Sequence, residues 1–281
     1  MSPSRLHATD LRVGYDDRVI IEDLSVEIPD GSFTVIVGPN ASGKSTLLRA
    51  LSRLLRPTRG AVLLDGHDVR EMGGKEFARE LGLLPQESIA PEGITVVDLV
   101  ARGRFPYQRL FRQWSDEDER AVREALEATQ LLELSTRPVE ALSGGQRQRV
   151  WIAMALAQET PILLLDEPTT YLDLAHQLEV LELCTRLHRQ GRTLVAVLHD
   201  LNQAARYASH LVAMSSGAVA AQGTPREVVT EEIVHRVFGV RARVIDDPES
   251  HTPMVIPLAS GAVSAADLPG DTAIAHDPSH P

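Results

Sequence analysis

Residues 38–45 constrain this 281-residue chain more than any other segment. They fit the spacing G-x-x-x-x-G-K-[ST], in which glycines let backbone amides turn inward around anionic phosphates. β-forming residues at 32–37 precede the loop, and leucines at helical spacing follow it from Leu47 to Leu55. Such a loop needs a strand before it and a helix after it. The sequence therefore predicts an α/β fold built around a phosphate site.

The loop supplies candidate ligands for ATP and for its metal ion. Lys44 is expected to reach the β- and γ-phosphates, and Ser45 is expected to ligate Mg²⁺. The residues expected to hold the nucleotide are Gly38, Pro39, Asn40, Ala41, Ser42, Gly43, Lys44, Ser45 and Thr46. An ordinary glycine-rich turn is the alternative interpretation, but the strand and helix patterns on either side favour a phosphate loop.

Two carboxylates follow the apolar run 162–165. At the end of a strand beside the phosphate loop, Asp166 can bind Mg²⁺ through water. Glu167 is then next to the γ-phosphate, where a carboxylate not tied to the metal can polarise the attacking water as general base. The alternative is a helix N-terminus with favourable negative charge. The neighbouring phosphate loop favours the catalytic interpretation.

Composition and charge disfavour several classes of protein. Apolar residues make up 43% and charged residues 24%, which is typical of a folded globular chain. The net charge of −11 argues against a nucleic-acid surface. No run approaches the roughly 20 apolar residues of a membrane span, so any membrane role is expected to be peripheral. The single cysteine, Cys184, suits a reducing cytosol.

The distribution of strand patterns predicts the order of the fold. The expected strands lie at 12–15, 19–28, 32–37, 162–165, 193–198 and 211–214. The first three predict a β-rich N-terminal lobe, in which Asp30 and Gly31 are typical of a hairpin turn. The last three alternate with helical patterns and predict a mostly parallel sheet of α/β type.

A helical and polar stretch at about 95–141 interrupts this order. Residues 115–118 are typical of a capping box that opens a helix through Leu126, Leu131 and Leu132. We interpret the stretch as an inserted helical lobe at about 90–150. Residues 258–281 are rich in Ala, Pro, Asp, Ser and His without periodicity, so a disordered tail is expected.

The segment 142–146 carries a resemblance to a known family. It reads Leu-Ser-Gly-Gly-Gln and resembles the signature sequence of ABC ATPases, the ATP-binding subunits of ABC transporters. A serine and two glycines can open a helix whose amides form a second anion site, although a capped helix without a ligand is the local alternative. The resemblance implies an ABC ATPase domain at 5–257 and a head-to-tail homodimer that encloses two ATP molecules. The residues implied to grip the γ-phosphate bound by the opposite subunit are Ser143, Gly144, Gly145 and Gln146.

The resemblance also implies roles for four residues outside these segments. Tyr15 resembles the aromatic residue that stacks on adenine, although a single tyrosine is more often part of a core. Gln86 resembles the glutamine that senses Mg²⁺ and the attacking water. His199 resembles the histidine that contacts the γ-phosphate, and Asp173 resembles the aspartate that communicates across the dimer.

Two positions depart from the family pattern without removing a ligand. Ala41 stands where a glycine is common, and Tyr171 where many relatives carry a small residue.

The segments that resemble the ATPases of ferric siderophore importers are 100–107, 151–158, 168–177 and 199–204. ATPases of haem or cobalamin importers share much of this pattern and remain alternatives.

The importer branch implies membrane partners. Two permease subunits would bind the dimer at the cytoplasmic face of the cell membrane, and an extracytoplasmic siderophore-binding protein would act with them indirectly. Residues 102–114 gather aromatic side chains and arginines, which suits a groove for a permease helix as well as the core of the helical lobe. A soluble scaffold ATPase in cofactor assembly is the alternative from another class. DNA-repair and ribosomal ABC ATPases are disfavoured, because the chain has no long heptad run and no internal repeat.

Overall fold

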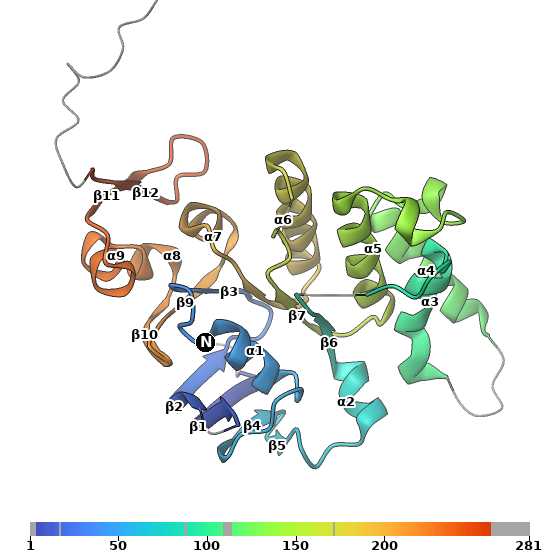
Figure 1. The fold of residues 1–281 in the computed structure, drawn as a ribbon, viewed down its shortest axis with the longest axis horizontal. Coiled ribbons are helices and arrows are strands. Elements are labelled where there is room, and N and C mark those ends of the chain that lie inside the picture. Colours follow the sequence, from blue (N-terminus) through green and yellow to red (C-terminus); the bar gives the residue numbers. More distant parts are fainter. Residues whose placement is uncertain (1–3, 17, 87–88, 109–113, 171, 260–281) are drawn as a thin grey trace, which may run out of the picture.

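A six-stranded sheet lies at the centre of the fold, in the order β10-β9-β3-β8-β7-β6 (Figure 1). The computed structural model describes residues 4–16, 18–86, 89–108, 114–170 and 172–259. The strands of this sheet are β3 (Phe33–Val37), β6 (Leu81–Leu84), β7 (Ile162–Asp166), β8 (Thr193–Val197), β9 (His210–Ser215) and β10 (Ala218–Gly223). Neighbouring strands are parallel except β10, which is antiparallel to β9. The mostly parallel sheet predicted from the sequence is confirmed.

Two separate cores form on the two faces of this sheet, because successive side chains of a strand point to opposite faces. Val35 shares one core with apolar side chains of α5 (Gly144–Ala157) and α6 (Leu174–Arg189). Ile36, the next residue of β3, shares the other core with α1 (Lys44–Leu51). Every residue of β3, β7 and β8 is buried, as expected for strands covered on both faces.

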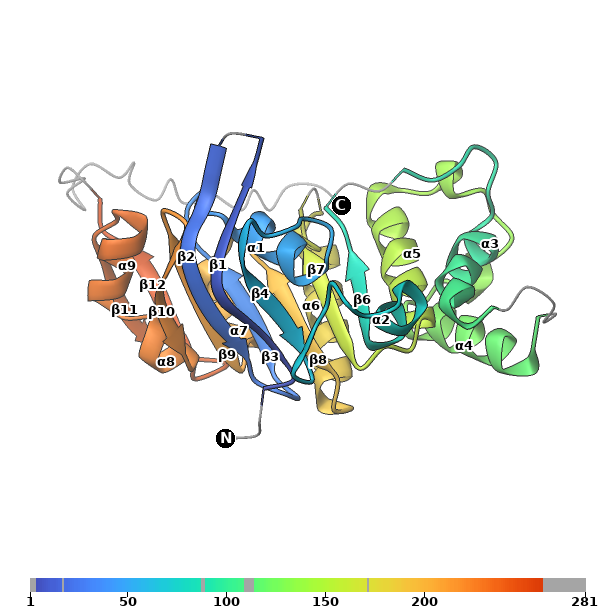
Figure 2. The ribbon, with the colours of Figure 1, turned by 90° about the horizontal axis from the view of Figure 1, so that it is seen from below.

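A four-stranded antiparallel sheet, in the order β2-β1-β4-β5, packs beside α1 (Figure 2). Its strands are β1 (Leu6–Tyr15), β2 (Arg18–Ile28), β4 (Arg59–Leu64) and β5 (His67–Asp68). The β-rich N-terminal lobe is therefore confirmed.

The hairpin expected at Asp30 and Gly31 is wrong, because β2 and β3 belong to different sheets. Gly31 adopts a φ of 65° and its N–H donates to Thr193 Oγ1 of β8 at 2.9 Å. The Thr193 hydroxyl in turn donates to the Asp30 carboxylate at 3.0 Å. A tight turn fixes only the local direction of the chain. The complete burial of β3 on both faces decides which sheet it joins.

The helical lobe packs α3 (Val96–Ala101), α4 (Asp116–Ala128) and α5 against one another, as Figure 1 shows. Three 3₁₀ segments complete it, at Arg102–Tyr107, Leu132–Leu134 and Val139–Ala141. Ser115 caps α4: its hydroxyl accepts from the N–H of Asp118 at 3.3 Å, and its own N–H donates to the Asp118 carboxylate at 3.2 Å. The predicted capping box is confirmed. The predicted extension of the helix through Leu131 and Leu132 is wrong, because α4 ends at Ala128 and Gln130 adopts a left-handed φ of 57°. Helix α2 (Gly74–Glu80) leads into β6 of the central sheet.

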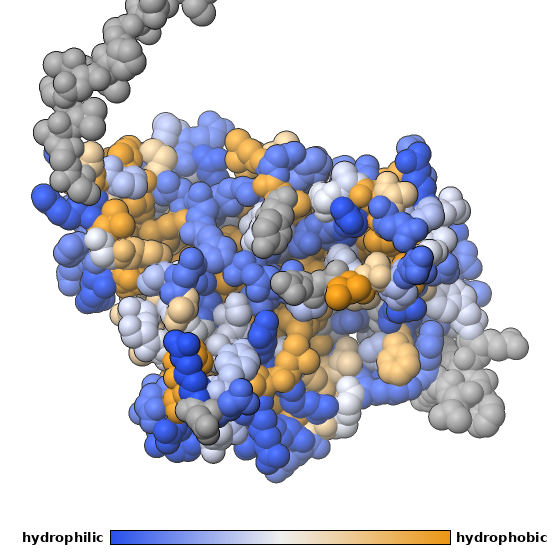
Figure 3. Space-filling model, in the orientation of Figure 1, coloured by the Kyte–Doolittle hydropathy of each residue, from blue (hydrophilic) through white to orange (hydrophobic). Residues whose placement is uncertain are grey.

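The C-terminal part adds α7 (Leu201–Tyr207), α8 (Pro225–Val228), α9 (Glu231–Phe238), β11 (Ala242–Asp246) and β12 (Pro253–Pro257). The side chain of Asn202 on α7 binds both backbone groups of Val255, at 2.7 and 3.2 Å, and thereby attaches the β11–β12 hairpin. Figure 3 shows apolar side chains gathered over α9 and this hairpin. The expected tail lies, from residue 260 onward, outside the described residues. Within the described ranges, no helix combines the length and apolar character needed to cross a membrane.

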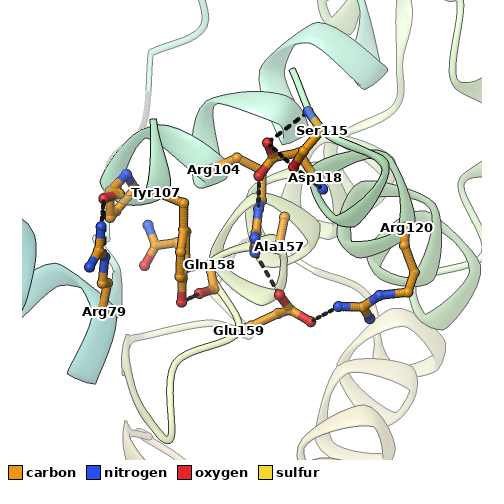
Figure 4. A network of polar contacts seen from close by, with 10 residues as sticks. Arg79, Arg104, Tyr107, Ser115, Asp118, Arg120, Ala157, Gln158 and Glu159 are labelled. Atoms are coloured by element: carbon orange, nitrogen blue, oxygen red, sulfur yellow. Dashed lines mark hydrogen bonds and ion pairs between the residues drawn. The ribbon is translucent and has the colours of Figure 1, made fainter. Parts of the chain in front are cut away.

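Arg104 joins the parts of the helical lobe through a buried ionic network (Figure 4). Its side chain is 1% exposed and donates to Asp118 of α4 at 2.9 Å and to Glu159, beyond α5, at 2.7 Å. It also donates to the carbonyl of Ala157 at the end of α5, at 2.8 Å. The ring of Tyr107 lies 4.1 Å from the guanidinium carbon. Because a desolvated charge is stable only when paired, this network specifies one arrangement of the 3₁₀ segment Arg102–Tyr107, α4 and α5.

Replacing Arg104 by methionine should destabilise the protein strongly. The substitution leaves the carboxylate of Asp118 buried without its cation, and breaking a buried pair from one side costs about 3 kcal/mol. Urea-induced unfolding measures the loss. The matched control is Arg120→Met, since Arg120 binds the same Glu159 from a half-exposed position, where a pair is worth less than about 1 kcal/mol. Equal losses in the two variants would contradict the prediction.

Candidate functional site

The loop 38–45 joins β3 to α1, as the sequence predicts. Its backbone is left-handed at Ala41, with φ of 61°, and at Gly43, with φ of 99°. Left-handed residues that alternate with other conformations can turn successive backbone N–H groups toward one side and form an anion-binding concavity. At Gly38, where φ is 153°, a Cβ would lie 2.3 Å from the carbonyl oxygen of Met214. A side chain therefore has no room at the point where the loop passes β9.

Lys44 extends back along the loop. Its Nζ donates to the carbonyl oxygens of Gly38 and Pro39, each at 2.9 Å. Burial lowers the pKa of Lys44, against the opposing effect of the carboxylates of Glu167 and Asp166. An ammonium has three N–H donors, and the two carbonyls use two of them. One donor is left for an anion in the loop.

Ser42 offers a second unused polar group. Its hydroxyl is buried and has no hydrogen-bond partner within the part of the chain that the structure describes. A buried hydroxyl without a partner is unfavourable by about 1–3 kcal/mol. Ser42 and the free donor of Lys44 both fit an oxygen-rich anion such as a phosphate group.

Ser45 and Asp166 form a pair of oxygen ligands. The hydroxyl of Ser45, at the start of α1, donates to Asp166 Oδ1 at the end of β7, at 3.0 Å. Burial raises the pKa of Asp166, and the hydrogen bond from Ser45 opposes that shift. A bound cation would relieve the unfavourable burial of this carboxylate. No cluster of three or more His, Cys, Asp or Glu side chains able to hold a metal is found in the described residues. The oxygens of Ser45 and Asp166 are of the type that Mg²⁺ takes together with substrate phosphates.

Glu167 collects contacts from the ends of three neighbouring strands. Gln86, after β6, donates from Nε2 to Glu167 Oε2 at 2.9 Å. His199, after β8, places Nε2 2.8 Å from Glu167 Oε1. The hydroxyl of Thr170 donates to Oε2 at 3.1 Å. Glu167 has a φ of 54°, a left-handed conformation that is uncommon outside glycine and that these contacts hold in place.

One cleft joins the loop to this carboxylate. It is lined by residues 40–46 of the loop, by Glu167 and His199, and by Arg18 and Ile20 of β2. The structure thus brings Lys44, Ser45, Asp166, Glu167, Gln86 and His199 together.

Tyr15 lies outside the residues that line this cleft. It is 39% exposed at the end of β1, and its hydroxyl accepts a hydrogen bond from Arg49 at 3.1 Å. The ring is therefore accessible on the surface of the antiparallel sheet.

The signature residues also lie apart from the cleft, at the start of α5. Ser143 caps this helix: its hydroxyl accepts from the N–H of Gln146 at 3.2 Å, and the Gln146 side chain accepts from the N–H of Ser143 at 3.1 Å. Gly144 has open space around its Cα, and Gly145 packs on a histidine ring. Asp173 caps α6 in the same way, by accepting from the N–H of His176 at 3.0 Å.

The family model described as ABC transporter matches residues 21–170. The chain belongs to the ABC transporter family. The ferric enterobactin transport ATP-binding protein of Escherichia coli (strain K12) is 55% identical over 95% of this chain and 98% of its own length. The iron(3+)-hydroxamate import ATP-binding protein of Bacillus subtilis (strain 168) is 51% identical over 89% of this chain and 94% of its own length.

Solved structures support the same assignment. An ABC transporter in an inward-facing conformation aligns with a TM-score of 0.79 and 29% identity, over 92% of this chain and 99% of its own chain. A dimeric ATP-binding cassette in a post-hydrolysis state, bound to ADP and Pi, aligns with a TM-score of 0.68 and 29% identity, over 78% of this chain and 98% of its own. The chain is accordingly an ATP-binding, ABC-type transport ATPase.

Sequence reasoning missed Thr170 and the cleft residues of β2. Thr170 reaches Glu167 because residues 167–170 form a turn, closed by the N–H of Thr170 on the carbonyl of Glu167 at 3.2 Å. Pro168 at the second position of such a turn was a readable signal. Arg18 and Ile20 approach the loop only through packing of the antiparallel sheet, and no local pattern marks them. Tyr171 lies outside the described residues.

Gly38→Ala should destabilise this ABC ATPase and disturb the loop. The new Cβ would contact the backbone of Met214, which has no flexible end to move, and such overpacking costs about 2 kcal/mol. Thermal unfolding measures the change. Gly74→Ala is the matched control, because a Cβ at Gly74 would meet only the distal end of Arg53 at 3.8 Å. Unchanged stability of Gly38→Ala would mean that the loop and β9 do not approach as described.

Proposed function

We propose that this chain is the ATP-binding and ATP-hydrolysing subunit of an importer for ferric siderophores. The observation that supports hydrolysis most directly is the junction at Glu167, by which we mean the contacts of its carboxylate with Gln86 and His199 beside the loop cleft. The assignment of ferric siderophores as the substrate rests on two relatives, at 55% and 51% identity, that are named for enterobactin and hydroxamate transport. ATPases of haem or cobalamin importers are the alternatives within the family.

The residues around the junction divide into three roles. Glu167 acts as general base on the attacking water, and Gln86 and His199 hold its carboxylate from both sides. Lys44 and the loop bind the phosphates, with His199 facing the γ-phosphate from the cleft wall. Ser45, Asp166 and Gln86 would hold Mg²⁺, which would neutralise phosphate charge when bound.

A second copy of the chain completes the site. Ser143, Gly144, Gly145 and Gln146 open α5 away from the cleft of their own chain, and their amides can bind the γ-phosphate held by the partner. Asp173 lies at the neighbouring helix start and communicates across the dimer. Tyr15, accessible beside Arg49, stacks on the adenine.

The ATPase unit spans residues 5–257, with the helical lobe at about 90–150, and it docks on permease subunits at the cytoplasmic face of the membrane. A groove on the lobe supports this proposal. Asp98, Arg102 and Gln108 line it together with Phe105, 65% exposed, and Trp114, 48% exposed. Exposed aromatic side chains beside arginine are typical of interfaces. An extracytoplasmic siderophore-binding protein completes the system.

Glu167→Gln should separate binding from hydrolysis. The amide keeps the size of the side chain and can remain beside Gln86, but it cannot accept a proton, so turnover should fall at least about a hundredfold. Phosphate release measures turnover. ATP binding and ATP-driven dimerisation, followed by fluorescence and size-exclusion chromatography, should persist. The control is Glu133→Gln on the exposed segment Leu132–Leu134, and near-normal hydrolysis by Glu167→Gln would assign the base to another residue.

Uptake of radioactive iron tests the cargo. Cells deleted for this gene are complemented with the wild type or with Glu167→Gln and are offered several ferric siderophores. We expect the wild type alone to restore uptake of at least one of them, because transport depends on hydrolysis. Uptake that is identical in every strain would contradict the siderophore assignment. Haem and cobalamin uptake would then be measured in the same strains, and failure to co-purify with any permease would favour a soluble scaffold ATPase.

A further inference from the structure

His176, on the first turn of α6, contacts two of the segments that the proposed dimer uses. Its Nδ1 lies 2.7 Å from Asp173 Oδ1, and its backbone N–H donates to the same oxygen at 3.0 Å. The other edge of the ring packs on the signature loop: a Cβ built on Gly145 would lie 2.8 Å from His176 Cδ2. One imidazole therefore spans from the aspartate at the start of α6 to the glycine at the start of α5.

The chain between Glu167 and Asp173 is held by glutamines from three helices. Gln148 of α5 donates to the carbonyl of Pro168 at 3.1 Å. Gln177 of α6 donates to the carbonyl of Leu172 at 3.1 Å, and Gln203 of α7 donates to the Gln177 side chain at 2.9 Å. These hydrogen bonds hold the carbonyls of Pro168 and Leu172, on the N-terminal side of Asp173. His176 adds a contact to the side chain of Asp173 and another to Gly145.

We propose that His176 is a positioning residue that holds Asp173 and the signature loop as one preformed unit for the nucleotide of the opposite subunit. This inference rests on the proposed dimeric ATPase. The Nδ1–H of the ring donates to the Asp173 carboxylate, which removes rotational freedom from a side chain that is otherwise exposed. The flat ring fits above Gly145, where a larger residue would displace it. Groups that are fixed before the two chains meet lose less entropy on closure.

Two substitutions separate the two contacts of His176. His176→Asn keeps an N–H donor near the position of Nδ1 and removes the part of the ring that packs on Gly145. His176→Phe keeps a flat ring on Gly145 and removes the donor to Asp173. Each is made in the otherwise unchanged chain, to measure turnover, and in the Glu167→Gln chain, to measure ATP-driven dimerisation. His235→Phe, at an exposed position of α9, is the matched control.

We expect His176→Phe to lower kcat at least fivefold and to raise, by a similar factor, the ATP concentration needed for dimerisation. His176→Asn should lower kcat as well, by at least twofold, because it keeps the donor to Asp173 but loses the packing on Gly145. Binding of a fluorescent ATP analogue to the monomer at low protein concentration should stay within twofold of wild type in both variants, because this binding uses the loop cleft. Thermal unfolding should remain close to that of the control.

Two outcomes would overturn the positioning role. Wild-type kcat in His176→Phe would show that the contact with Asp173 is not used. An equal loss of monomer nucleotide binding and of turnover would show a structural role only. Failure of the proposed function would give a different result. The Glu167→Gln chain with His176 unchanged would then bind ATP without forming a dimer, which would contradict both the two-chain site and this inference.

Discussion

The parallel register of β6, β7 and β8 is the constraint on which the candidate site depends. Leu84 pairs with Leu165, and Asp166 pairs with Val197, so the three strands end at nearly the same level. Gln86, Glu167 and His199 follow directly after these ends and meet without any long loop. A shift of one strand by one residue would separate the three side chains and would also turn the apolar side chains of that strand to the wrong face. The core that stabilises the sheet and the geometry that positions the carboxylate are therefore the same set of contacts.

Burial gives the site its electrostatic character. It lowers the pKa of Lys44 and raises that of Asp166, and each shift makes the charged form of its group less favourable. Both groups lie near the loop, but their hydrogen bonds go to other partners: Lys44 donates to carbonyls, and Asp166 accepts from Ser45. A phosphate group would supply a negative charge for Lys44, and a cation would supply a positive charge for Asp166. Binding of a nucleotide together with a cation would therefore relieve the unfavourable burial of both groups.

The sequence predicted the parts of the structure that local chemistry decides. The phosphate loop, the carboxylates after β7 and the capping box at Ser115 were all found from short patterns, and the structure places each where expected. The hairpin at Asp30 and Gly31 was a wrong prediction, since a turn sequence does not determine which sheet the next strand joins. The order of strands in the antiparallel sheet and the partners of Arg104 depend on contacts between residues far apart in the chain. No local pattern contains that information.

Helix α5 connects the buried network at Arg104 to the signature glycines. At its C-terminal end, the buried side chain of Arg104 binds the carbonyl of Ala157. At its N-terminal end, Gly145 packs on His176. Contacts at both ends and a continuous ladder of i→i−4 hydrogen bonds between them couple the position of one end of α5 to that of the other. The 3₁₀ segment that carries Arg104 also carries Phe105 of the exposed groove. A partner bound in that groove that moved the 3₁₀ segment would therefore also move the signature glycines at the start of α5. A flexible connection between the segment and the helix would not transmit this movement.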